Sequence, residues 1–250
     1  MSDVRTLILD LETQPTSAFV WGLWDQRVGL NQIVEPGKII SWAAAWAGSD
    51  EVEYSSINIT SHKKMIWEIW KLLDEADEAV GWNSNSFDLK LLNAAFAVYG
   101  FGPPSPYKRI DLMRTVKSQM KFISNKLDFV SGQFGVGHKM EHEGFGLWVR
   151  CMNGEQEAWD LMHAYNIEDV LLTERMYDKL RGWIHNGVNR STVTKGFVCP
   201  SCGSSHLHSR GKAVTTTLTY ARFQCQDCGT WSRERIAEKQ PEKTKLVLAR

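Results

Sequence analysis

The chain has 250 residues, of which 43% are hydrophobic and 23% charged, proportions that are typical of a folded globular protein and exclude dominant disorder. Its length accommodates one large domain and a small module. It contains no apolar run of about 18 residues and no basic segment followed by an apolar one near its start. We therefore expect no membrane-spanning helix and no secretion, and predict a cytoplasmic protein.

The 29 basic and 29 acidic residues cancel, but they are distributed unevenly. Residues 191–250 hold 10 basic and 4 acidic side chains, whereas residues 1–190 hold 19 and 25. This split predicts a basic module attached to a mildly acidic domain. A second basic cluster spans residues 108–139, where seven basic residues accompany two acidic ones. Such a cluster can bind phosphates, so we expect a nucleic-acid partner, with contacts from Arg114, Lys117 and Lys121.

The predicted elements alternate between strands and helices. Short apolar runs rich in β-forming residues predict strands, and apolar residues spaced three and four apart predict helices. In chain order they are strands at 4–11, within 31–48 and at 52–59, a helix at 62–76, a strand at 79–82, and helices at about 88–99, 124–134 and 157–184. The order predicts an α/β fold in which a mixed sheet is flanked by helices.

Acidic residues stand at three points of this pattern. Asp10 and Glu12 end the first strand, where their i, i+2 spacing places both carboxylates on one face. Two like charges so close repel each other unless a cation lies between them. Asp88 opens a helix just after a strand, and Tyr165 lies four residues before Asp169 on one helix face. Each feature alone also has an ordinary explanation: a solvated strand end, a first-turn acid, or a surface pair.

Together, the segments LILDLET, GWNSNSFDLKLL and AYNIEDVLLTERMY resemble the three motifs of the DEDD superfamily of 3′→5′ exonucleases, in the family's order. The resemblance spans roughly residues 4–185 and implies a ribonuclease-H-like fold. It further implies that Asp10, Glu12, Asp88 and Asp169 hold two Mg²⁺ or Mn²⁺ ions. Oxygen ligands suit both ions, and such a pair can stabilise the attacking water and the leaving oxygen.

The same resemblance implies the tyrosine class of the superfamily. That class carries Tyr four residues before the last Asp, as Tyr165 stands before Asp169, whereas the other class carries His five residues before it. Tyr165 is then the fifth catalytic residue, and we expect His163, six residues before Asp169, to be a packing or surface residue. Asp111 either ends a strand near the site and supports a ligand there, or is an ordinary charged strand end, and both readings stay open.

Three further residues are expected to contact substrate. Trp21 and Trp24 follow the first motif in a loop that could overhang the site, where an aromatic ring can stack on the terminal base. The alternative is that they pack in the core, as we expect for most of the other tryptophans. Asn83 lies within the second motif.

Four of the five cysteines form two C-x2-C pairs separated by 22 residues: Cys199, Cys202, Cys225 and Cys228. Four thiolates close a tetrahedral site, which predicts one structural Zn²⁺ in a zinc ribbon. A disulfide framework would require an oxidising compartment, for which the sequence carries no signal. Arg222 and Arg233 of the ribbon could contact phosphates. We predict a nuclease domain at 1–187, the ribbon at 195–235 and a flexible tail at 236–250.

The leading hypothesis is a metal-dependent 3′→5′ exonuclease, with single-stranded DNA preferred over RNA. Its small two-part layout fits a replication or repair nuclease of phage type. A structure-specific endonuclease on the same fold is one alternative, against which the Tyr-x-x-x-Asp pair speaks. The other is a non-catalytic zinc-ribbon protein that binds nucleic acid, although a degenerate enzyme should have lost a carboxylate.

Overall fold

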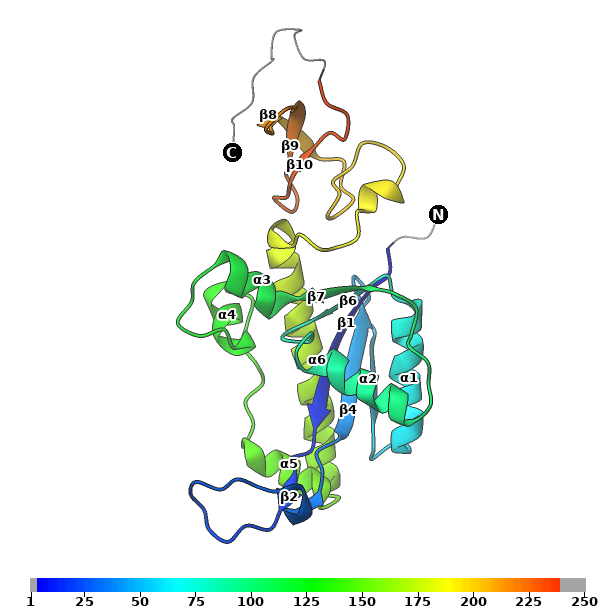
Figure 1. The fold of residues 1–250 in the computed structure, drawn as a ribbon, viewed down its shortest axis with the longest axis vertical. Coiled ribbons are helices and arrows are strands. Elements are labelled where there is room, and N and C mark those ends of the chain that lie inside the picture. The colour runs from blue at the N-terminus through cyan, green and yellow to red at the C-terminus, as the bar shows by residue number, and fades with distance from the viewer. Residues whose placement is uncertain (1–3, 239–250) are drawn as a thin grey trace. The chain divides into compact units, whose positions relative to one another are not determined.

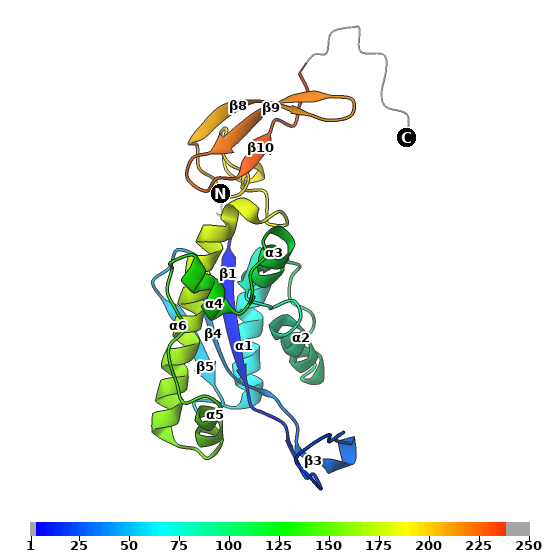
Figure 2. The same ribbon diagram turned by 90° about the vertical axis from the view of Figure 1, so that its left-hand side faces the viewer.

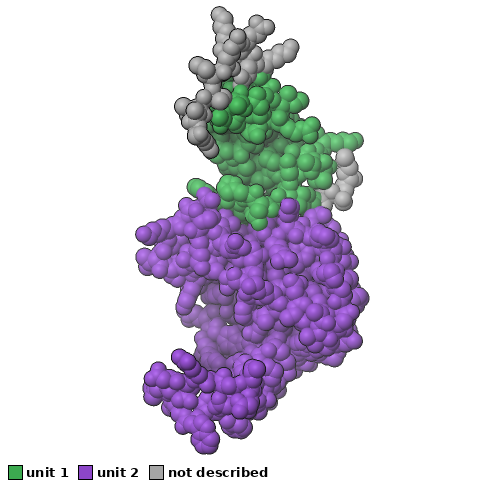
Figure 3. Space-filling model, viewed as in Figure 1, with its two compact units in different colours: residues 1–4, 177–250 green, residues 5–176 purple. Residues whose placement is uncertain are grey.

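The computed structural model describes residues 4–238. The described chain forms two compact units, residues 5–176, purple in Figure 3, and residue 4 with residues 177–238, green in Figure 3. From residue 239 onward the predicted tail at 236–250 lies outside the described residues. Among the residues described, no helix is long and apolar enough to cross a bilayer.

A five-stranded mixed sheet forms the centre of the first unit, in the order β5-β4-β1-β6-β7 (Figure 1). β1 pairs antiparallel with β4, and parallel with β6 only as far as Ile8. Beyond Ile8 one edge of β1 is therefore free to meet other groups. The strands are β1 (Thr6–Thr13), β4 (Ile39–Trp46), β5 (Val52–Ser56), β6 (Glu78–Gly81) and β7 (Lys108–Asp111).

Helices cover both faces of this sheet. α1 and α2 lie against one face and α6 against the other (Figures 1 and 2). The helices are α1 (His62–Glu75), α2 (Asp88–Val98), α3 (Leu112–Gln119), α4 (Leu127–Gln133), α5 (Phe145–Met152) and α6 (Gln156–Leu180). α1 begins where the Ser61 hydroxyl accepts the Lys64 N–H at 3.3 Å, and it buries apolar residues at helical spacing, Met65, Ile66, Ile69 and Leu73.

The side chains of β1 alternate between the two faces. Leu7, Leu9 and Leu11 join the buried core that includes α1 and α2. The even-numbered residues Asp10 and Glu12 therefore point to the opposite face, which α6 covers. This alternation places two carboxylates under a helix rather than in solvent.

Most predicted elements are present, and the differences have local causes. α3 and α5 were not predicted, because each is too short to show a clear period, and β7 was raised only as the strand that Asp111 would end. The long helix ends at Leu180 rather than near residue 184, and continues as the 3₁₀ helix η2 (Arg181–Trp183) around a glycine, the poorest helix former after proline. A small hairpin, β2 (Ser17–Ala18) and β3 (Ile33–Glu35), with η1 (Leu30–Gln32), completes the unit.

The second unit begins with the last turn of α6 and contains an antiparallel sheet in the order β10-β9-β8. Its strands are β8 (Leu207–Val214), β9 (Thr219–Cys225) and β10 (Trp231–Arg233). The predicted linker at 185–195 contains a short 3₁₀ helix, η3 (Arg190–Thr192). At Gly182, an added Cβ would lie 2.7 Å from the carbonyl oxygen of Cys228, so only glycine permits this close approach. The domain boundaries at 187 and 195 stay predictions.

Candidate active site

Three carboxylates converge on the sheet face that α6 covers. Asp10 and Glu12 come from β1 and Asp169 from α6, and one oxygen of each lies within 4.8 Å of the others. Glu12 is 9% exposed and Asp169 1% exposed. Burial and then repulsion from neighbouring carboxylates raise the pKa of Asp10 well above its usual value and that of Glu12 to about 8. Burial also raises the pKa of Asp169. The cluster therefore needs protons or a cation.

Asp88, the fourth predicted carboxylate, approaches from the first turn of α2 and lies outside this group of three. One of its oxygens accepts the N–H of Leu11 at 3.2 Å, on the stretch of β1 that β6 leaves unpaired. Burial raises the pKa of Asp88 to about 6, although the hydrogen bond from Leu11 opposes the shift. Its charge raises the pKa of Asp10, so the two carboxylates interact.

Asp111 supports the loop that delivers Asp88. Its carboxylate accepts the N–H groups of Asn83 and Asn85, both at 3.2 Å, and so holds the loop between β6 and α2. The start of this loop is tight: a Cβ added to Gly81 would lie 2.7 Å from a side-chain atom of the next turn. Of the two readings of Asp111, the structure favours the supporting role. Asn83 has φ of +66° and its substrate contact stays a prediction.

Asn166, which sequence reasoning missed, positions Asp10. Its amide nitrogen donates to Asp10 Oδ2 at 3.0 Å, and its amide oxygen accepts from the Ser41 hydroxyl at 3.2 Å. Asn166 is fully buried, and so is Ser41. The bond to Asp10 leaves fewer orientations open to that carboxylate. A signal was available, because Asn166 lies between Tyr165 and Asp169 in the third motif.

Among residues 4–238, Lys139 is the one lysine whose ammonium group contacts this carboxylate cluster. Its Nζ donates to Asp169 Oδ2 at 2.6 Å and to the Tyr165 hydroxyl at 2.9 Å. These partners raise the pKa of Lys139 although burial opposes the shift. The loop carrying Lys139 is anchored by Asp128, which accepts the Lys139 N–H at 3.0 Å. Sequence reasoning counted Lys139 in the basic cluster without assigning it to the site. His163 instead contacts Tyr54, at 4.2 Å between ring centroids.

An open pocket of about 480 Å³ lies beside Glu12. Three aromatic side chains line it: Phe87 before α2, and Phe145 and Trp148 from α5. Phe87 is 43% and Phe145 67% exposed, so both rings are accessible. Accessible aromatic rings can stack on the base of a nucleotide. Phe87 was present in the second motif, whereas the other two lie on the unpredicted α5.

The predicted substrate contacts occupy other positions in this unit. Trp21 and Trp24 lie on the loop between β2 and β3, where they are fully and 83% exposed, and neither lines the pocket beside Glu12. Arg114 and Lys117 are exposed on α3, and Lys121 is exposed just after it. Their spacing of three and four residues suits one surface. All five roles stay predictions.

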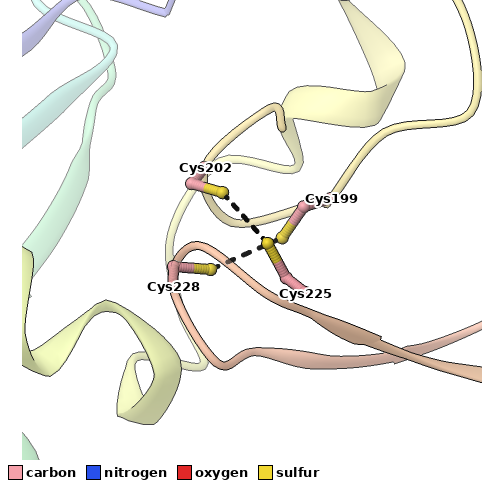
Figure 4. A group of neighbouring side chains, drawn as sticks. All are labelled: Cys199, Cys202, Cys225 and Cys228. Atoms are coloured by element: carbon pink, nitrogen blue, oxygen red, sulfur yellow. Dashed lines mark hydrogen bonds between the residues drawn. The ribbon is translucent and has the colours of Figure 1, made fainter. Parts of the chain in front are cut away.

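The four cysteines of the second unit gather as the spacing predicts (Figure 4). The sulfur–sulfur distance is 3.6 Å for Cys199–Cys228 and for Cys202–Cys225, too long for a disulfide bond of about 2.05 Å. A tetrahedral site with metal–sulfur bonds of about 2.3 Å has sulfur–sulfur edges of about 3.8 Å. The sulfurs therefore fit a Zn²⁺ ion. Burial raises the pKa of the Cys228 thiol, but hydrogen bonds, chiefly with Thr230, outweigh it and lower that pKa to about 7.

Residues 7–181 match the model of the RNase_H superfamily. The chain belongs to this superfamily. No curated protein matches it. Among solved structures, the chain resembles the family B DNA polymerase from the hyperthermophilic archaeon Pyrobaculum calidifontis, with a TM-score of 0.53 and 20% identity.

The match with the polymerase covers 72% of this chain and 25% of the polymerase, so the chain spans a quarter of that protein's length. At 20% identity the likeness concerns the fold alone. Membership of the RNase_H superfamily and this likeness confirm the predicted α/β fold of a mixed sheet flanked by helices.

The carboxylates of this RNase_H superfamily member fit a divalent cation. Asp169 Oδ1 is buried and has no hydrogen-bond partner, which is costly for a carboxylate oxygen unless a cation approaches it. Its neighbours Asp10 and Glu12 add oxygens within 4.8 Å, the ligand type that Mg²⁺ and Mn²⁺ prefer. Lys139 contacts the other oxygen of Asp169 and so does not occupy Oδ1.

Proposed function

We propose that the protein is a metal-dependent 3′→5′ exonuclease that hydrolyses phosphodiester bonds, with single-stranded DNA as its preferred substrate. The observation that carries the proposal is the convergence of Asp10, Glu12 and Asp169 beside an aromatic pocket. Membership of the RNase_H superfamily supports a nuclease. The polarity rests on the three motifs that resemble those of DEDD exonucleases. A role in phage-type replication or repair completes the proposal.

Asp10, Glu12, Asp88 and Asp169 would hold two Mg²⁺ or Mn²⁺ ions in this proposal. When bound, the ions would supply charge stabilisation for the attacking water and the leaving 3′-oxygen. The buried carboxylates provide the negative charge that such a pair needs, and Asn166 keeps Asp10 oriented. Cation binding would also relieve the repulsion that raises the carboxylate pKa values.

The remaining groups act on substrate and water. The Tyr165 hydroxyl, which accepts from Lys139 Nζ at 2.9 Å, would orient a water molecule for attack on phosphorus. The Lys139 ammonium can exchange its contact with Asp169 for one with the scissile phosphate, which keeps its charge paired. Phe87, Phe145 and Trp148 would stack on the terminal base.

Matched DNA and RNA strands that carry a label at either end test the proposal, with Mg²⁺ and no chelator present so that zinc is retained. We expect immediate release of 3′-labelled mononucleotide, a shortening ladder from the 5′-labelled strand, and no product from the Asp10→Ala variant. Cleavage of a circular single strand would instead establish the endonuclease. Binding without cleavage of any substrate would establish the non-catalytic binding protein.

A further inference from the structure

The second unit contains a groove of about 870 Å³ that the nuclease site does not explain. Its lining includes Gly196, Val198 and Pro200 and several residues of β9 and β10. Its aromatic and basic side chains are Phe197, Tyr220, Phe223, Trp231, Arg233 and Arg235. The zinc-binding cysteines do not line the groove, so its side chains are available for another purpose.

Two large aromatic side chains of the groove are half exposed. Trp231 is 52% exposed and Phe197 is 58% exposed. Phe197 meets Phe223 edge to face, with 4.8 Å between the ring centroids, which holds the Phe197 ring in one orientation. Tyr220 is only 8% exposed and belongs to the small core. Part of the Trp231 ring and part of the Phe197 ring therefore stay accessible, because the core of this unit does not bury them.

Guanidinium groups lie over the aromatic rings. Arg222 lies 4.9 Å from the Trp231 ring centroid and Arg233 lies 3.9 Å from that of Tyr220. Both also donate to backbone carbonyl oxygens, at 3.0 to 3.2 Å. Neither is paired with a carboxylate within residues 4–238. The two charges are thus held in place and are not neutralised by another side chain.

The surrounding charge is positive. Residues 190–238 contain seven basic and three acidic side chains. Two of the acids have cationic or imidazole partners: Glu238 lies 2.6 Å from Lys212 Nζ, and Asp227 lies 3.2 Å from His206 Nδ1. Among residues 4–238, Glu234 is the only acid that lines the groove. An anionic occupant with flat, stackable groups matches this combination of charge and aromatic surface.

We infer that this groove binds a segment of single-stranded nucleic acid, with bases stacked on Trp231 and Phe197. The phosphates would lie beside Arg233 and Arg235, which line the groove, and beside Arg222, which lies over the Trp231 ring. Bases in a duplex are already stacked on each other, so the rings would favour single strands. The inference deepens the proposed function by giving the exonuclease a second contact with its substrate. It differs from that function in a testable way, since binding requires no cleavage.

The test uses the full chain with neither Mg²⁺ nor chelator, and measures fluorescence anisotropy of a labelled 20-nucleotide single strand and of the matching duplex. Because stacking on one aromatic residue is typically worth about 1–3 kcal/mol, Trp231→Ala should weaken single-strand binding about tenfold. Duplex affinity should change less than about twofold. Trp231→Phe, which keeps an aromatic ring, should retain most of the wild-type affinity for the single strand. Trp183→Ala is the matched control, because Trp183 is 47% exposed in the same unit but outside the groove.

A charge variant tests the phosphate contact independently. Arg222→Gln should reduce the slope of log affinity against log salt by about 0.7, the value for one phosphate contact on a single strand. Zinc content and thermal melting of each variant show whether the ribbon is intact, and if Trp231→Ala lost zinc, the salt slope of Arg222→Gln would decide. Wild-type single-strand affinity in zinc-containing Trp231→Ala, an unchanged salt slope in Arg222→Gln, or an equal loss for duplex and single strand would overturn the inference. Absence of nuclease activity would leave this result unchanged.

Discussion

Replacing Glu12 by Gln should stabilise the metal-free protein while it removes activity. The substitution keeps the shape of a side chain that is 9% exposed but removes its negative charge. Burial and the nearby Asp169 raise the pKa of Glu12 from an ordinary 4.5 to about 8. The folded state therefore binds a proton that the unfolded chain releases, so this stability contribution is present below about pH 4.5 and is lost as the pH rises through 8.

The size of the effect follows from these two pKa values. From the linkage between proton binding and folding, the ionisation of Glu12 lowers the free energy of unfolding by about 2 kcal/mol at pH 6 and about 4 kcal/mol at pH 8. Gln does not ionise, so the free energy of unfolding of the variant should exceed that of the wild type by about these amounts. Weakening of the hydrogen bond between Trp148 and residue 12 would reduce this gain. Added Mg²⁺ should make the wild type the more stable of the two proteins, because Mg²⁺ binds the wild-type carboxylate cluster more tightly.

Urea unfolding at pH 6, 7 and 8, in buffer freed of divalent ions without a chelator, measures this difference. Glu53→Gln, at an exposed position of β5, is the matched control and should show no growing difference with pH. The electrostatic reasoning would be refuted if the Gln variant were less stable than the wild type at pH 8. It would also be refuted if the difference in free energy of unfolding between the two proteins were the same at all three pH values.

Three further predictions concern other residues. Tyr165→Phe should lower the single-turnover rate at saturating Mg²⁺ by about 10²–10⁴-fold with little change in stability, and a wild-type rate would remove Tyr165 from the site. Lys139→Met should lower metal-free stability at pH 8 by about 2 kcal/mol because Asp169 loses its cation, and Mg²⁺ should restore it; unchanged urea midpoints would contradict this. Replacing Cys225 and Cys228 by Ser should release one zinc per chain and unfold the ribbon while residues 5–176 still melt cooperatively; zinc retention in elemental analysis would disprove the site.

Local spacing was enough to predict a large part of the molecule. The period of two along β1 put Asp10 and Glu12 on one face, and the period of α1 predicted the face that packs on the sheet. The paired C-x2-C segments predicted the cysteine cluster. These features depend on residues close in sequence, whose relative positions follow from backbone geometry once the element type is known.

The α/β class, the acidic residues and the four thiols could be predicted from the sequence, because each depends on short-range spacing. The distant groups that contact them became known only from the packing of the folded chain. Lys139 reaches Asp169 across 30 residues and Asn166 reaches Asp10 across 156, while α5 brings Phe145 and Trp148 beside Glu12. Such contacts depend on how whole elements pack against one another, and no local period records that packing.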